Sequence, residues 1–437
     1  TFGKLLAEKH QVNVVAGWRY ASNRSVNDAY TAIGFPDDNV PNPAFANQYA
    51  ASSKPSYSES TARSTSFYVN GNYSFANRYL LDFNFREDGS SVFGVNKRFT
   101  GSWSVGVAWN IHNEAFMGDW ADLLKIRFSV GNPGNQNFSS YKSYTTYAYN
   151  TVVQNMFGMG AEVSAYGNPD LKWQKTIDYN LGADISLFNN YLKINADVYY
   201  KNTDPLLITS SIASSTGRDD YVTNMGATKT RGISLSTIVT LINWKERALR
   251  WTVSWNGRHQ VQEYDKIGNS LDLLNAELKK SSLQRYRDGG SPTDIWAVRS
   301  AGIDPMTGEE VFIKKDGTYS FIYDNNDEVI VGNTEAKLEG VFGTTVYYKG
   351  FSLSAHFRYR FGADYFNREL YNRIENILPG QYTVYNQDRR ALYDRWQKPG
   401  DHARYRRITS TVQENQTYPM TDRYVQRERT LSGESIS

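Results

Sequence analysis

The chain has 437 residues, and its 48 Lys and Arg residues against 45 Asp and Glu residues give a formal net charge of +3. A dedicated nucleic-acid binder usually carries a clear basic excess, so this balance argues against that class. The absence of Cys excludes disulfides, thiolate metal sites and a cysteine nucleophile. No stretch approaches the roughly 20 apolar residues of a membrane-spanning helix. A membrane β-barrel stays compatible with the mean hydropathy of −0.59, because its strands are apolar on one face only.

Apolar and polar residues alternate along much of the chain. In the run 67–75 the odd positions are Phe, Val, Gly, Tyr and Phe, and after a short turn the run 79–86 repeats the pattern. A strand with one apolar face repeats every two residues, because successive side chains point to opposite faces. The two runs therefore predict a β-hairpin.

The same period predicts about eleven strands in all. Their ranges in chain order are 12–20, 67–75, 79–86, 102–110, 124–130, 177–187, 192–200, 233–241, 249–255, 341–347 and 351–361. The links between them are alternately short and long. The long links are 86–100, 132–172, 202–230 and 256–340. From about residue 362 the alternation of apolar and polar residues fades. An up-and-down barrel has short turns at one rim and long loops at the other, whereas a soluble sandwich has no reason to keep this order.

The composition of the two strand faces favours a membrane-spanning barrel. One face is Asp, Asn, Lys, Arg, Ser and Gly, and the other has aliphatic centres with aromatic ends, as interfacial girdles require. Ten residues rise about 33 Å, which a tilt near 45° reduces to about 24 Å of membrane. The predicted fold is all-β, an antiparallel transmembrane β-barrel. We expect Leu81, Phe83, Val105, Ile185 and Leu353 to face lipid.

Catalytic and metal-binding patterns are missing from the sequence. The five His residues lie far apart, and neither a His-Glu-x-x-His helix nor a Gly-x-Ser-x-Gly elbow occurs. We therefore predict no enzyme activity, no catalytic residue, no cofactor and no metal site. The acidic run 324–328 has oxygen ligands that suit Ca²⁺ but lacks EF-hand spacing, so a polar loop tip is the stronger interpretation. The basic run 404–407 is interpreted as solvated loop or barrel lumen.

Five segments carry a recognisable pattern, and they occur in the order 79–94, 109–127, 168–182, 301–309 and 395–401. In this order they resemble the SusC/RagA-like TonB-dependent outer-membrane transporters of Bacteroidetes. We interpret the residues of these motifs as structural, and the first motif as loop-forming. They are Asp88, Gly89, Ser90, Ser91, Phe93, Gly94, Trp173, Arg395, Trp396, Pro399, Gly400 and Asp401.

The resemblance implies a barrel of roughly 22 strands, of which residues 1–437 would be the C-terminal part of one domain. A plug domain, N-terminal strands and final strands would then be absent from this chain. It further implies an outer-membrane location, import of oligomeric glycans or peptides, and contact with lipid. A SusD-like surface lipoprotein would cover the long-loop rim, and TonB would act through the missing N-terminal part. No nucleic-acid partner is expected.

Aromatic side chains in two long links are candidates for substrate or lid contact. They are Tyr141, Tyr144, Tyr147, Tyr149 and Trp296. An aromatic face offers apolar area to a sugar ring or a peptide, and tyrosine adds a polar group. Packing within the loop explains the same residues equally well.

The sequence is compatible with two other functions. One is a passive porin or a structural outer-membrane component of a larger surface or secretion assembly. The other is a secreted, soluble carbohydrate-binding β-protein. A plug domain in the upstream coding sequence would favour active import, and detergent-free solubility of the folded protein would favour the secreted protein.

Overall fold

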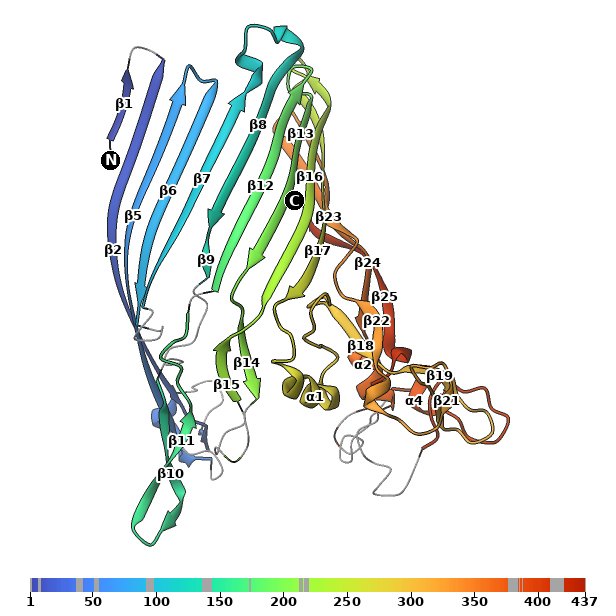
Figure 1. Cartoon of the computed structure of the whole chain (residues 1–437). Helices are drawn as coiled ribbons and strands as arrows, with labels where there is room; N and C mark the ends of the chain where they lie inside the picture. The colour runs from blue at the N-terminus through green and yellow to red at the C-terminus, as the bar shows by residue number, and fades with distance from the viewer. Residues whose placement is uncertain are drawn as a thin grey trace.

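The structure is a computed structural model dominated by one curved antiparallel sheet, with hairpins and loops gathered at one end (Figure 1). Among the residues that it describes, no helix has the length and apolar character to cross a membrane. The described residues are 2–6, 9–36, 42–50, 55–91, 98–135, 144–172, 174–211, 215, 220–375, 384, 386, 388–408 and 420–436.

The strands of the sheet lie side by side in chain order. Within the described residues the sheet has 14 strands, of which 13 form a continuous series and β9 (Gly134–Asn135) adds a short pairing with β12. The series is β1 (Phe2–Leu6), β2 (His10–Ala29), β5 (Ser56–Phe75), β6 (Tyr79–Ser90), β7 (Phe99–Asn110), β8 (Ala121–Asn132), β12 (Gln174–Leu187), β13 (Leu192–Thr203), β16 (Ala227–Trp244), β17 (Leu249–Asp265), β23 (Leu338–Tyr348), β24 (Phe351–Phe366) and β25 (Val425–Ile436). β1 and β25 stand at opposite ends of the series, so the described strands form an open arc (Figure 1).

All eleven predicted strands are present within these elements, but the predicted number is too low. The series also contains β1, which is too short to show a period, and β25. β25 has charged residues on both faces, yet its backbone pairs with β24 from Val425↔Phe366 to Ile436↔Ala355. The alternation of apolar and polar residues does fade after residue 362, but strand structure continues in β25. Backbone pairing extends the sheet where the side-chain pattern gives no signal.

The predicted order of short and long links is confirmed except at 91–98, which is shorter than the link 111–120 although it lies at the opposite rim. Short links at 76–78, 111–120, 188–191, 245–248 and 349–350 lie at one rim, which we call the short-turn rim. Several of their residues have positive φ, among them Asn77 at 57° and Asn190 at 64°, which suits tight turns. The long links lie at the opposite, long-loop rim (Figure 1).

The long links contain structure of their own. They hold β3 (Ala32–Ile33), β4 (Gln48–Tyr49), β10 (Thr146–Asn155), β11 (Gly158–Ala165), β14 (Leu207–Ser211), β15 (Asp220–Asn224), α1 (Asp272–Ser281), β18 (Asp294–Ala297), β19 (Arg299–Ile303), β20 (Glu310–Ile313), β21 (Tyr319–Ser320), β22 (Val329–Asn333), α2 (Arg368–Leu370) and α4 (Arg390–Tyr393). The predicted loop 86–100 is shorter than expected, because β6 continues to Ser90 and β7 begins at Phe99. β2 and β5 pair along all 20 residues, so this hairpin rises about 66 Å and projects past the long-loop rim.

The cross-strand register separates an apolar outer face from a polar inner face. Phe128, Leu181 and Val198 pair directly across β8, β12 and β13 and are 42%, 54% and 56% exposed. Of the side chains predicted to face lipid, Leu81, Phe83 and Leu353 are exposed, and Val105 and Ile185 are half-buried. The pairings Phe83↔Val105 and Ile185↔Leu124 place these apolar residues on the outer face too.

Aromatic residues line the outer face at the short-turn rim, as the sequence predicted. The rings of His10 and Phe75 lie 4.9 Å apart, and Phe75, Tyr79 and Trp109 follow as a stacked row at 6.4 and 6.5 Å. The polar tips of Tyr79 and Trp109 both donate to Glu114 Oε1, at 2.9 and 3.0 Å. Such a row, apolar outward and hydrogen-bonded at its tips, is typical of a membrane interface.

Leu181→Arg should destabilise the folded sheet by about 2–4 kcal/mol near the membrane midplane, because it places a charge on the lipid-facing side. Asn180→Arg, one residue away on the inner face, should be nearly neutral, because its charge meets water. Reversible unfolding of the full-length protein in lipid vesicles measures both. Equal costs at the two positions would contradict the assignment of faces.

Candidate functional site

Ion pairs join neighbouring strands across the inner face. Arg127 of β8 reaches two carboxylates, with Nη2 2.8 Å from Asp197 Oδ1 and Nε 3.3 Å from Asp184 Oδ2. Gly182 lies under the guanidinium, where a Cβ would come within 2.6 Å of Arg127 Cζ. The glycine thus leaves the space through which the arginine crosses β12. This contact explains why residue 182 is a glycine, which the alternation of apolar and polar residues does not explain.

A second group of ion pairs runs from β17 to β25. Arg258 pairs with Glu339, whose other oxygen lies 3.4 Å from Arg360, and Arg360 also pairs with Glu428 at 2.5 Å. These side chains are partly exposed, so each pair adds little stability. Their main consequence is a polar wall on which opposite charges lie side by side, as expected of the inner face of a membrane barrel.

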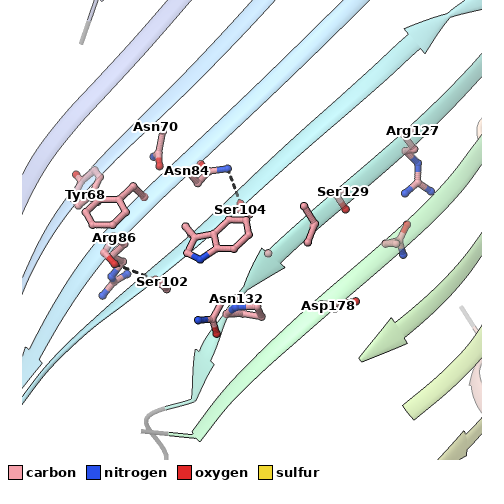
Figure 2. Close-up of a pocket in the computed structure, with 16 residues that line it drawn as sticks. Tyr68, Asn70, Asn84, Arg86, Ser102, Ser104, Arg127, Ser129, Asn132 and Asp178 are labelled. Carbon is pink, nitrogen blue, oxygen red and sulfur yellow. Dashed lines mark hydrogen bonds between the residues drawn. The ribbon is translucent and has the colours of Figure 1, made fainter. Parts of the chain in front are cut away.

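A depression of about 740 Å³ lies on the inner face over β5–β8 and β12 (Figure 2). Inside it Asn84 Nδ2 donates to Ser104 Oγ at 3.2 Å, and Ser102 Oγ donates to the Arg86 carbonyl at 3.3 Å. Small and medium polar side chains from five strands align to form it. The sequence predicted a polar face here but not a depression, because that depends on register between strands.

The links that follow β17 and β24 pack together beyond the long-loop rim (Figure 1). We call this assembly, residues 266–337 with 367–375, 388–408 and 420–424, the loop platform. Phe366 and Met420 pack against its core. The buried core residues are Leu370, Tyr371, Ile374, Ala391, Tyr405 and Tyr424. The long links are therefore folded structure with a hydrophobic core.

A buried charged cluster holds the two halves of the platform together. Arg423 binds Glu310 through two hydrogen bonds of 2.9 and 3.0 Å, and its Nη2 lies 3.3 Å from Glu375 Oε1. Thr421 Oγ1 adds a hydrogen bond to Glu310 at 2.8 Å. Glu310 and Glu375 are each only 2% exposed. Removing Arg423 would leave two unpaired buried carboxylates, a change that typically costs about 3–5 kcal/mol.

Two of the sequence motifs, which are far apart in the chain, dock on each other in the platform. Trp396 Nε1 and the Gly400 N–H both donate to the Pro305 carbonyl at 2.9 Å. The Trp396 ring covers Gly308, which has a φ of +72° and where a Cβ would lie 2.5 Å from the indole. The segments 301–309 and 395–401 thus form one contact.

Arg395 and Asp401 organise the chain around this contact. The buried Arg395 guanidinium donates to the carbonyls of Ala391 at 2.8 Å, Arg406 at 2.9 Å and Ile374. Asp401 Oδ2 accepts the N–H groups of residues 397 and 398 at 3.1 and 2.9 Å, closing the turn that contains Pro399 and Gly400. These contacts account for the motif through folding alone.

The basic run 404–407 pairs within the platform. Arg406 and Arg407 lie 2.8 and 2.6 Å from the two carboxylate oxygens of Glu309. Arg404 lies with its guanidinium 6.0 Å from the Tyr405 ring centre. Arg406 and Arg407 thus hold this segment against the 301–309 motif through their ion pairs with Glu309.

Residues 88–90 of the first motif form strand, whereas the motif was interpreted as loop-forming. Asp88, Gly89 and Ser90 belong to β6, and Asp88 is 7% exposed with Arg86 Nη2 2.7 Å away. Ser91 follows the strand, and its hydroxyl accepts the Arg63 N–H at 2.9 Å. Backbone pairing to β5 and β7 outweighs the turn preference of these residues. Phe93, Gly94, Trp173 and Tyr141 lie outside the described residues.

The aromatic candidates do not gather in one place. Tyr144 OH is 2.6 Å from Arg98 Nη2, which donates to it, and Tyr147 and Tyr149 stand 65% and 73% exposed on β10. Trp296 is half-buried in β18 with the Arg287 guanidinium 4.9 Å over its ring. β10 and β18 belong to separate links and separate hairpins (Figure 1). Contact of these residues with a substrate or a lid stays a prediction.

The acidic run 324–328 has hydrogen-bond partners within the protein. Asp324 Oδ1 accepts the Asn326 N–H at 2.8 Å. Glu328 is buried against Arg285, with bonds of 2.6 and 2.9 Å. No cluster of three or more His, Asp or Glu side chains suited to a metal occurs in the part of the chain that the structure describes. Calcium binding here stays a prediction.

Sequence reasoning missed the residues that hold the platform together. Arg285–Glu328 joins positions 43 apart, and Arg423–Glu310 joins positions 113 apart. A charged residue in a long polar link gives no sign of burial, so only the contact itself reveals the pair.

Comparison with known proteins agrees with a sheet that has an apolar outer face and a polar inner face. The family model described as "TonB dependent receptor-like, beta-barrel" matches residues 2–275. The chain belongs to the TonB dependent receptor-like, beta-barrel family. This transmembrane barrel fold accounts for the two faces of the sheet, and the family is one of receptors rather than enzymes.

Relatives and solved structures agree with the family. TonB-dependent receptor SusC of Bacteroides thetaiotaomicron is 32% identical over 315 residues, covering 67% of this chain and 30% of that protein. TonB-dependent receptor P39 of Formosa agariphila is 26% identical over 452 residues, covering 92% of this chain and 42% of that protein. A chain of the RagAB peptide transporter superposes with a TM-score of 0.79 at 24% identity, covering 98% of this chain and 47% of that chain. This receptor-like chain thus spans less than half the length of each.

Gly308→Ala should destabilise the loop platform more than Gly400→Ala. Both glycines have positive φ, but a Cβ at Gly308 meets the Trp396 ring at 2.5 Å, whereas the space at Gly400 is open. Strain alone costs about 1–2 kcal/mol, and overpacking adds about 1–3 kcal/mol. Limited proteolysis of the full-length protein measures opening of the platform. Equal cleavage rates for the two variants would contradict the docking contact.

The platform should lose stability between pH 10 and 12. Burial raises the pKa of Tyr371 to about 12, and burial likewise raises the pKa of Tyr323 to about 12. Because these folded-state values exceed the unfolded value near 10, the stabilisation is complete below pH 10 and is lost as pH rises toward 12. Tyrosinate absorbance and near-ultraviolet circular dichroism follow this change. Tyr371→Phe should make the loss shallower, and an unchanged profile would refute the role of this residue.

Proposed function

We propose that this chain forms part of one transmembrane barrel domain of an outer-membrane transporter that imports oligomeric nutrients, glycan or peptide, in a TonB-dependent manner. The observation that carries the proposal is the single sheet with an apolar outer face and an ion-paired inner face. That sheet lies in a chain whose residues 2–275 match the receptor barrel family.

The two ends of the sheet have different parts in this proposal. The short-turn rim, with Glu114 binding Tyr79 and Trp109, anchors the periplasmic interface. The long-loop rim lies outside the cell and carries the loop platform. The inner wall supplies a hydrated, charge-balanced surface along which a polar oligomer moves without strong trapping.

We further propose that a SusD-like surface lipoprotein covers the long-loop rim. Exposed apolar side chains at Tyr319, Phe321 and Ile322, which are 69%, 57% and 79% exposed, support a covered surface on the platform. Energy from TonB would enter through the plug segment that the family resemblance implies. The relatives named TonB-dependent receptors support this coupling.

Uptake by cells that carry the full-length gene tests the function. A strain deleted for the gene should lose uptake of a fluorescent oligosaccharide or peptide mixture, and the complete gene should restore it. A second strain deleted for TonB should lose the same uptake. Uptake that persists without TonB would instead support the passive porin. Purification of the full-length protein in detergent should also recover the lipoprotein partner.

A further inference from the structure

A second stretch of aromatic residues lies on the outer face at the short-turn rim, from β16 to β24 (Figure 1). Cross-strand register arranges it as two rows of four residues each. The row at the rim is Trp244, Leu249, Tyr348 and Phe351. The next row toward the middle of the sheet is Ile242, Trp251, Val346 and Leu353. We call these eight residues the β16–β24 strip.

Two cations are held at the edge of this strip by its own rings. The Arg247 guanidinium carbon lies 5.0 Å from the Trp244 ring centre, and Lys349 Nζ lies 5.3 Å from the Tyr348 ring centre. Both distances suit a cation–π contact. The two turns are neighbours, since the Lys349 N–H donates to the Ala248 carbonyl at 3.0 Å. The two cations therefore stand on adjacent turns, directly beside the rim row.

The polar groups of the rim row have no acceptor within the protein. In the part of the chain that the structure describes, Arg247 and Lys349 form no ion pair, and Trp244 Nε1 and the Tyr348 hydroxyl form no hydrogen bond. By contrast, Trp251 Nε1 in the next row donates to a threonine hydroxyl at 2.9 Å. Guanidinium, ammonium and indole N–H groups only donate, so the rim row suits a ligand rich in acceptors.

The first aromatic stretch, from β2 to β7, shows the opposite arrangement. There Glu114 accepts hydrogen bonds from Tyr79 and Trp109, and Arg78 Nη1 lies 3.4 Å from its other oxygen. That stretch contains its own anion. Segments 242–251 and 346–353 contain four basic residues and a single acidic one, Glu246, so the second stretch keeps a positive excess.

We propose that the β16–β24 strip binds an anionic phospholipid of the membrane, of the phosphatidylglycerol type. Its phosphodiester accepts from Arg247, Lys349 and Trp244, as the Glu114 carboxylate does in the first stretch. Its acyl chains lie over the apolar row from Ile242 to Leu353. The proposal goes beyond transport, because it needs only that the sheet spans a membrane.

The chemistry of the strip favours this occupant over related ones. A zwitterionic headgroup brings its own ammonium group, which the two cations repel. Free phosphate uses the donors of the rim row but leaves the apolar row uncovered. An anionic lipid satisfies both parts at once, and basic residues at a membrane surface attract such lipids.

Native mass spectrometry of the purified full-length protein tests the site. The probes are a phosphatidylglycerol and a phosphatidylethanolamine with the same acyl chains, titrated separately into the protein in detergent. A basic residue near an anionic lipid surface adds about fivefold in affinity, so phosphatidylglycerol should bind at least about tenfold more tightly than phosphatidylethanolamine. Excess inorganic phosphate should not displace it, because phosphate has no chain to cover the apolar row.

Matched variants separate the site from the general charge of the rim. Arg247→Gln with Lys349→Gln should reduce the preference for phosphatidylglycerol to less than about twofold. Lys9→Gln with Arg78→Gln removes the same charge from the stretch beside Glu114 and should keep the parent preference. Arg247→Lys keeps a cation on the turn and should keep most of it. All variants should keep the heat-modifiable migration of a folded barrel.

Three results would overturn the site. Equal affinity of the parent protein for the two lipids would show that the strip does not select an anion. Equal weakening in both double variants would assign the preference to net charge at the rim. Displacement of the lipid by inorganic phosphate would show that the donors bind phosphate without the apolar row.

Discussion

The structure depends on one constraint, that backbone N–H and C=O groups in a membrane must bond to each other because lipid offers no partners. Antiparallel pairing from β1 to β25 meets this requirement along the arc. Pairing then fixes the two faces, since residues opposite each other in register share a face. The outer row Phe128, Leu181 and Val198 and the inner ion pairs of Arg127 are two results of this one register.

A different interaction governs the long-loop rim. The platform has no continuous sheet to order it, and it is held by a small aromatic core with charges buried beside it. Arg423 compensates Glu310 and Glu375, and Arg285 compensates Glu328. Buried pairs of this kind add little net stability but make the loss of either partner costly. They therefore fix how the two long links are arranged relative to each other.

The strand pattern was predictable because period two is a local property of the side chains. All eleven predicted strands exist, as does the order of short and long links except at 91–98. The errors share a cause. β25 and the Asp88–Ser90 end of β6 have sequences without a strand signal, and a neighbouring strand imposes their conformation. Of the candidate site residues, Trp396 and Gly400 meet at the Pro305 carbonyl, and Arg395 and Asp401 order the chain beside it. The tyrosines of β10 and Trp296 lie in separate links.

The sequence by itself determined the all-β class, the two faces and the family resemblance, because each depends on residues near one another in the chain. Only the tertiary structure decided which polar residues meet. Gly182 beneath Arg127, Trp396 over Gly308, and Asn84 beside Ser104 join residues on different strands or links. Such contacts depend on register and on loop packing, and these arise from the sum of many weak interactions along the whole chain.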